Sequence, residues 1–211
     1  MPIVAIDLIK KHIKTNIIIY FIIILCLLVG ISVGGFTVKI VSENHKQELV
    51  SYLRGFFSLF HNDSIKSGDI LSQSLINNFQ LLGLCYVLGL SIIGIIGVFF
   101  IMAFKGFVVG FTVGLLIEQF KFKGCLLFML GVLPQNLIII SVFIAASVVS
   151  SSFALAFIKD KLNKTKQANF YERFLKYTGA YLGFSILILI AVLIETLISP
   201  IFIKMIGAYI Q

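Results

Sequence analysis

Charged side chains are scarce in this chain of 211 residues. Asp, Glu, Lys and Arg make up 12% of it, about half of the roughly 25% found in an average globular domain. Hydrophobic residues make up 59%, and the mean hydropathy is +1.08. A soluble protein of 23.4 kDa cannot bury that much apolar surface, so the composition excludes a soluble enzyme, a disordered chain and a small secreted domain. We predict an integral membrane protein.

The sequence also lacks the residue patterns of catalytic and metal sites. Cys26, Cys85 and Cys125 stand singly in apolar runs, which is not the spacing of a disulfide or zinc framework. The three histidines lie outside the apolar stretches, and none has a second ligand at metal-binding spacing. No hydrolase, metalloprotease, phosphate-loop or dinucleotide motif is present. We therefore expect no catalytic residue, cofactor or metal, and no enzymatic activity.

Positive charge is in excess, with 17 Lys and Arg against 9 Asp and Glu. Six basic residues lie between Lys159 and Lys176, and others precede the first apolar stretch at Lys10, Lys11 and Lys14. Membrane proteins concentrate Lys and Arg in their cytoplasmic loops, which accounts for this distribution. The charge therefore predicts orientation in a lipid bilayer and gives no indication of nucleic-acid binding.

Stretches without a charged residue locate the expected membrane spans. A span needs about 20 apolar residues to cross the hydrocarbon layer. One stretch has 35 residues, which is too long for a straight crossing, and Pro134 interrupts it. We expect a single all-α membrane domain over residues 1–211, a bundle of five transmembrane helices with the N-terminus cytoplasmic, Lys105 in a cytoplasmic turn and the C-terminus extracytoplasmic. The expected spans are 15–38, 79–104, 106–122, 124–158 (broken near Pro134) and 177–203.

Residues 39–78 form the expected extracytoplasmic segment. Leu49, Leu53, Phe56 and Phe60 recur at the spacing of one helix face, which predicts a short amphipathic helix lying in the membrane interface. Two interpretations remain open: the helix covers the end of the bundle, or it receives an extracytoplasmic partner. In the second case the candidate docking residues are Phe56, Phe57, Phe60 and, at the outer end of the last span, Glu195.

Two further patterns lie inside the expected spans. Gly106, Gly110 and Gly114 form a small-residue stripe that lets another helix approach closely. Pro134, Gln135 and Asn136 lie close to the middle of the bilayer, where amides need internal hydrogen bonds. The amides either satisfy carbonyls released by the proline and link neighbouring helices, or form a substrate or ion site at a broken helix, as in transporters.

These features, in this order, resemble the stage II sporulation protein M family over essentially the whole chain. The resemblance is carried by Asn77-Asn78, by Gly89 and Gly94, by Phe104-Lys105-Gly106-Phe107 with Gly110-Phe111, and by Leu133-Pro134-Gln135-Asn136. The wider family often has Pro-His-Gly followed by Glu at the proline step. Gln135 and Asn136 replace that pattern here, and Ile139 is apolar, as in the sporulation branch.

The resemblance implies a role in engulfment of the forespore. Family members of the sporulation branch are membrane proteins thought to anchor the stage II sporulation proteins D and P, which degrade peptidoglycan. We therefore expect a non-enzymatic scaffold in the mother-cell membrane at the septum, with Asn77, Asn78 and the glycine stripe holding the bundle together. A transporter or permease subunit that uses the broken fourth helix is the alternative, and a homo-oligomer stays open.

Overall fold

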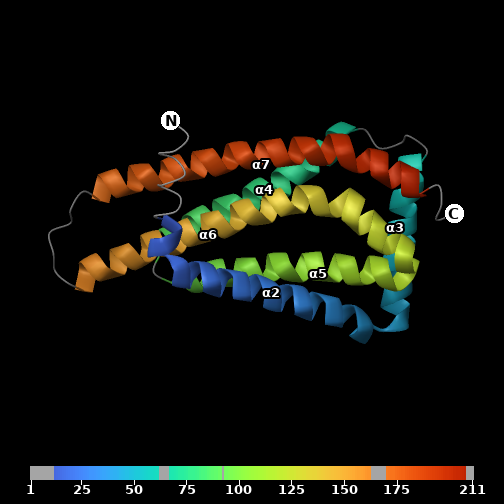
Figure 1. Ribbon diagram of the computed structural model, residues 1–211, viewed down its shortest axis with the longest axis horizontal. Coiled ribbons are helices and arrows are strands. Elements are labelled where there is room, and N and C mark those ends of the chain that lie inside the picture. The colour runs from blue at the N-terminus through green and yellow to red at the C-terminus, as the bar shows by residue number, and fades with distance from the viewer. Residues whose placement is uncertain (1–11, 62–66, 92, 163–169, 208–211) are drawn as a thin grey trace.

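The protein is a helical bundle with one helix lying across its end (Figure 1). The computed structural model describes residues 12–61, 67–91, 93–162 and 170–207; within them, side chains are described except at 52–54, 56–61, 67, 69–70, 160–162 and 198–207. In this part of the chain there is no strand. The elements are α2 (Ile17–Ile40), α3 (Glu43–His61), α4 (Ser67–Gly89), α5 (Gly94–Leu127), the π-helix η1 (Phe128–Val132), α6 (Leu133–Leu162) and α7 (Phe170–Gly207).

The long helices α2, α4, α5, α6 and α7 lie side by side along the long axis, and α3 crosses one end (Figure 1). We call this the α3 end, and the other the opposite end. α2 and α5 both run toward the α3 end, and α6 returns from it. The long helices thus form an antiparallel arrangement in which α2 and α5 are parallel to each other.

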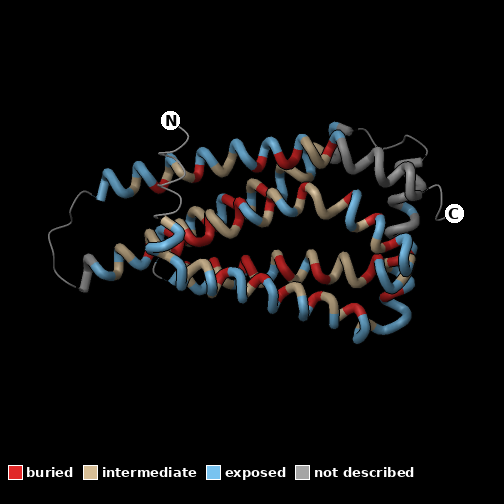
Figure 2. The backbone as a smooth tube through the Cα atoms, in the orientation of Figure 1, coloured by how far each residue is buried: buried red, intermediate tan, exposed pale blue. Residues whose placement is uncertain are grey.

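Buried and exposed positions alternate along the long helices (Figure 2), and large apolar residues occupy positions of both kinds. The core joins side chains from α2, α4, α5, α6 and α7, among them Ile23, Met102, Phe143 and Ile188. The outer surface exposes Phe21, Ile96, Phe100 and many other large apolar residues. Apolar faces of this extent, on helices this long, fit contact with lipid.

Three helical segments of the described chain are long and apolar enough to cross a membrane: Ile17–Ile40, Gly94–Lys159 and Phe170–Leu197. The second has 66 residues and contains α5, η1 and most of α6. Within it, α5 runs toward the α3 end and α6 runs back (Figure 1). α4 does not qualify because it carries Gln73, Asn77, Asn78 and Gln80. The all-helical membrane architecture agrees with the sequence prediction, and the count of five crossings stays a prediction.

The helix boundaries differ from the expected spans in the middle of the chain. We expected a turn at Lys105, between spans 79–104 and 106–122. The chain instead turns between Gly89 and Gly94, and α5 continues from Gly94 through Lys105 without a break. The turn contains no charged residue, so the charge-free stretches could not reveal it. Polar α4, which begins at Ser67, takes the place of the expected second span.

Two sharp corners of the chain depend on a glycine. A Cβ on Gly94 would lie 1.8 Å from the carbonyl oxygen of Leu88, and a Cβ on Gly124 would lie 1.9 Å from that of Leu116. Neither contact leaves room for a side chain. The chain can therefore fold back after α4, and again within the segment assigned to α5, because these two positions lack a Cβ.

Lys121 forms the second corner and carries a strained backbone. Its φ of 50° and ψ of −124° break the regular helix, and it is the one non-glycine residue with positive φ in the described chain. An L side chain is unfavourable there. Replacing Lys121 by glycine is expected to raise the free energy of unfolding by about 1 kcal/mol. The control Lys159→Gly, in a regular part of α6, should lower the free energy of unfolding by about 0.5–1 kcal/mol. Detergent unfolding followed by circular dichroism compares the two variants. A destabilised Lys121→Gly protein would contradict the prediction.

The closest helix pair is α2 with α5, and glycines make it close. A Cβ on Gly106 would lie 2.3 Å from the carbonyl oxygen of Leu27, and one on Gly110 would lie 2.1 Å from that of Ile31. α2 contributes Gly30 and Gly34, whose added Cβ atoms would meet carbonyl oxygens of α5 at 2.0 and 2.2 Å. The two backbones are therefore in direct contact along several turns.

Candidate functional site

The candidate site is a polar region in the middle of the bundle, between α4, α5 and α7. Lys105 lies at its centre. Counted along α5 at 1.5 Å per residue, Lys105 is about 16 Å from the turn at residues 90–93, which is roughly half the thickness of a bilayer's hydrocarbon core. An ionisable residue at that depth marks a functional site by default.

The Lys105 ammonium is held by two neighbours. Its Nζ donates a hydrogen bond to Oδ1 of Asn78 on α4, at 3.1 Å. It also lies 4.7 Å from the ring centroid of Phe143 on α6, which is a cation–π contact. We expected Lys105 in a cytoplasmic turn, but it lies within α5, inside the bundle. A lysine is tolerated there because Asn78 accepts its hydrogen bond and Phe143 offers an aromatic face.

A chain of hydrogen bonds continues from Lys105 to the carboxylate of Glu195 on α7. Asn78 Nδ2 donates to Ser74 Oγ at 3.4 Å and to the Ser74 carbonyl oxygen at 2.9 Å. The Ser74 hydroxyl donates to Oε2 of Glu195 at 2.5 Å. Lys105 and Glu195, which carry opposite charges, thus stand at the two ends of this chain. Every donor in the chain points from the cation toward the anion, so α5, α4 and α7 share one polarised connection.

Glu195 and Asn78 therefore have defined contacts, and Asn77 has a different one. Glu195 was a candidate for partner docking at the outer end of the last span; its carboxylate faces Ser74 and is only partly exposed. Asn77 accepts a hydrogen bond from Gln73 one turn earlier and is exposed. The structure thus separates the Asn77-Asn78 pair: Asn78 links helices, and Asn77 lies on the outer face of α4.

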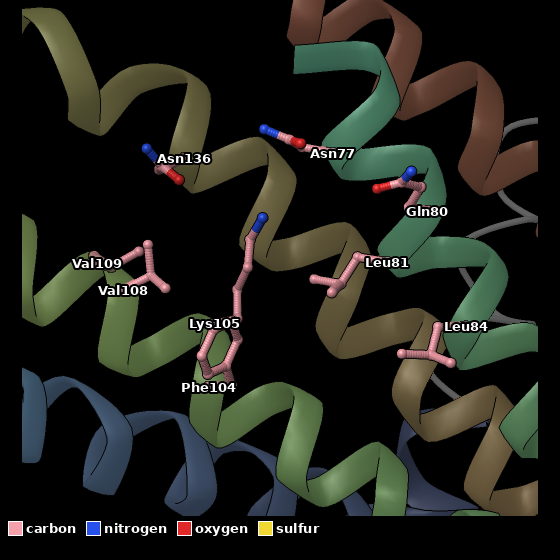
Figure 3. A pocket seen from close by; sticks show the side chains of 9 residues that line it. All are labelled: Asn77, Gln80, Leu81, Leu84, Phe104, Lys105, Val108, Val109 and Asn136. Carbon is pink, nitrogen blue, oxygen red and sulfur yellow. The ribbon is translucent and has the colours of Figure 1, made fainter. Parts of the chain in front are cut away.

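A pocket of about 510 Å³ opens beside Lys105. Figure 3 shows Lys105 rising from α5 toward the space between Asn77 on α4 and Asn136 on α6. Gln80 adds a further amide. The rest of the lining is apolar: Leu81, Leu84, Phe104, Val108 and Val109. The volume is in the usual range for small-molecule sites, which are mostly apolar with a few placed polar groups.

The proline step of the fourth expected span is present as a π-helix followed by α6. η1 ends at Val132, and Pro134 occupies the first turn of α6, where its missing N–H does little harm. Gln135 Nε2 donates to the Gly131 carbonyl oxygen and Asn136 Nδ2 to that of Val132, both at 2.8 Å. The amides therefore satisfy backbone carbonyls of the irregular turn. Asn136 also lines the pocket.

Sequence reasoning missed a second polar cluster, at the opposite end. Ser150 on α6 donates to the Cys85 carbonyl oxygen and bonds to the hydroxyl groups of Tyr177 and Tyr181 on α7. The Tyr177 hydroxyl donates to the Tyr86 carbonyl oxygen at 2.8 Å. Both carbonyls belong to the end of α4, so the cluster attaches that end to α6 and α7. The signal lay in the aromatic spacing of Tyr177 and Tyr181, which matches one helix face.

At the α3 end, an ion pair holds the start of α3 against the tip of α5. Lys46 Nζ lies 2.6 Å from Oε1 of Glu118 and 3.2 Å from Oε1 of Glu43. The hydrogen bond to Glu118 holds the pKa of Lys46 above its ordinary value. The other candidate docking residues, Phe56, Phe57 and Phe60, belong to α3, but their side chains lie outside the described residues.

Metal binding finds no support in the parts of the chain that the structure covers. No three His, Cys, Asp or Glu side chains of the described residues come close enough to hold a metal ion. The central region offers one ammonium group, one carboxylate and several amides.

The comparison with family models decides the classification. The model of the family described as stage II sporulation protein M matches residues 23–200. This chain belongs to that family. The match covers the glycine interface, the Lys105 chain and the proline step, so it confirms the resemblance that the sequence motifs indicated. No curated protein and no solved structure matches the chain. Within the stage II sporulation protein M family, the structure therefore adds the arrangement around Lys105.

Proposed function

We propose that this stage II sporulation protein M family member is a non-enzymatic membrane scaffold of the engulfment machinery. Its partners are the peptidoglycan-degrading stage II sporulation proteins D and P, which it anchors at the septal membrane. The family match over residues 23–200 carries the proposal. The N-terminus is cytoplasmic, and the α3 end faces the extracytoplasmic side, where the partners act.

The build of the α3 end supports this role. α3 crosses that end of the bundle (Figure 1), and Lys46 fixes its first turns through Glu118. Away from Lys46, these turns carry exposed polar side chains, including His45 and Glu48. A helix that is attached on one face and exposed on the other presents a fixed surface to a partner.

Serine replacements at Phe56, Phe57 and Phe60 are expected to reduce recovery of proteins D and P with the tagged chain by about tenfold, because a few apolar anchors dominate most interfaces. The measurement is quantitative co-purification from sporulating cells after mild detergent extraction. Tyr171→Ser with Leu175→Ser, two exposed positions at the opposite end, is the matched control and should leave recovery unchanged.

The same co-purification separates scaffold from permease. The π-helix before Pro134 and the pocket beside Lys105 favour a permease as the second candidate function. Recovery of a cytoplasmic ATPase without proteins D and P would support that alternative. Full recovery of both partners by the Phe56, Phe57 and Phe60 variant would contradict α3 as the docking surface.

A further inference from the structure

The pocket beside Lys105 opens toward the surrounding lipid. Three of its lining residues are large, apolar and on the outside of the bundle: Leu84 is 48% exposed, Phe104 52% and Val108 45%. They lie on facing sides of α4 and α5. In a membrane, side chains of this kind contact acyl chains. A ligand therefore reaches the pocket by moving sideways out of the bilayer.

Polar donors remain available inside this apolar opening. The Lys105 ammonium has three N–H groups, and among the described residues its one hydrogen-bond acceptor is Asn78. Gln80 is exposed and has no hydrogen-bond partner among the described side chains and backbone groups. Unpaired donors in hydrocarbon are costly. A ligand that supplies anionic oxygens would satisfy them.

The depth of Lys105 determines what such a ligand must look like. A headgroup that reaches it enters roughly halfway into the hydrocarbon and loses most of its hydration. This loss is offset only when a counter-charge and hydrogen-bond donors replace the water. Lys105 and Gln80 provide both for an anion, and Leu84, Phe104 and Val108 provide apolar contact for the chain attached to it.

We infer that this pocket binds an anionic phospholipid, with the phosphate at Lys105 and Gln80 and an acyl chain along Leu84, Phe104 and Val108. The Glu195 carboxylate reaches Lys105 only through Asn78 and Ser74, so among the described residues no anionic oxygen contacts the ammonium directly. This open contact favours a phosphate without a cationic partner group over a zwitterionic headgroup. The lipid-facing opening favours a lipid over a soluble anion. This role is independent of the scaffold function, because the pocket lies away from α3, in the middle of the bundle.

The absence of tryptophan from the chain makes binding directly measurable. Phe104→Trp places a single indole at the mouth of the pocket. Leu28→Trp is the control: Leu28 is an exposed residue of α2 at similar depth, since nearby Gly30 packs on Ala103. Each protein is reconstituted in phosphatidylcholine nanodiscs that contain equal fractions of either brominated phosphatidylglycerol or brominated phosphatidylcholine. Bromine quenches an indole only at contact.

Brominated phosphatidylglycerol is expected to occupy the pocket about tenfold more readily than brominated phosphatidylcholine, the effect of one charge-assisted contact, and so to quench Phe104→Trp more strongly. The Leu28→Trp control should show no such preference. Adding Lys105→Gln should abolish the preference at Phe104→Trp. Gln80→Leu leaves Lys105 and its hydrogen-bond chain to Glu195 intact and should reduce the lipid preference. This second variant tests the inference if Lys105→Gln does not fold.

Equal quenching by the two lipids at Phe104→Trp would overturn the inference, as would a preference that survives Lys105→Gln. A third result would also contradict the inference. If inorganic phosphate shifts the emission of Phe104→Trp, the shift requires Lys105, and the two lipids quench equally, the pocket binds a soluble anion.

Discussion

Replacing Gly110 by leucine is expected to separate α2 from α5 and to unfold the bundle in mild detergent. The first side-chain carbon would lie 2.1 Å from the Ile31 carbonyl oxygen, which is backbone and cannot rotate away. The helices must move apart, and the neighbouring contacts at Gly34 and Gly106 are then lost. Since van der Waals contact drives helix association in lipid, we expect a loss of more than about 3 kcal/mol.

The matched control is Gly183→Leu on α7. A Cβ at Gly183 would meet no atom within 4 Å, so this leucine should point into lipid and leave stability unchanged or slightly higher. The two proteins are compared by SDS titration in detergent micelles, followed by circular dichroism and size-exclusion chromatography. Equal midpoints for Gly110→Leu and the original protein would show that α2 and α5 do not pack through their glycines.

The sequence indicated the glycine stripe but not the helix that it contacts. Gly106, Gly110 and Gly114 predict close approach from local spacing alone. The helix they approach is α2, whose own Gly30 and Gly34 pack on the backbone of α5, and nothing in the spacing of either set specifies the other. Partner choice depends on where the chain turns, and one of those turns, at residues 90–93, carries no charge to mark it. Local patterns therefore predicted the helices better than their pairing.

The position of Lys105 could not be predicted from its local sequence. A charged residue between apolar runs is usually a loop residue, because burying an ammonium in lipid is costly. The rule fails here because Asn78, Ser74, Glu195 and Phe143, distant in sequence, surround or connect to the ammonium. One warning was present in the sequence: the run after Lys105, residues 106–117, is too short to cross a bilayer.

The proline step was the most local of the polar features and the easiest to interpret. Pro134 cannot donate a backbone hydrogen bond, and the next two residues are amides within reach of the preceding turn. Gln135 and Asn136 do bond to carbonyls four residues earlier. The sequence could not reveal that Asn136 also borders a pocket, because Lys105 and Gln80 reach that pocket from other helices.

Removing one member of the Lys105–Glu195 connection is expected to destabilise the protein, and removing both is expected to restore part of the loss. Lys105→Met leaves a carboxylate without its counter-charge, and Glu195→Gln leaves an ammonium at mid-bilayer depth. We expect each single change to lower the free energy of unfolding by about 2–3 kcal/mol. The double variant should lose about 1–3 kcal/mol less than the sum of the two, because it leaves no unpaired charge.

An exposed ion pair of the same residue types provides the reference for that coupling. Lys176 and Glu172 lie 2.7 Å apart on α7, with side chains 75% and 57% exposed. The cycle of Lys176→Met and Glu172→Gln should show coupling of only about 0.3–0.5 kcal/mol, since water screens the pair. SDS titrations of both cycles under identical conditions give the comparison. Coupling at Lys105 and Glu195 no larger than at this surface pair would mean that the chain through Asn78 and Ser74 does not join the charges energetically.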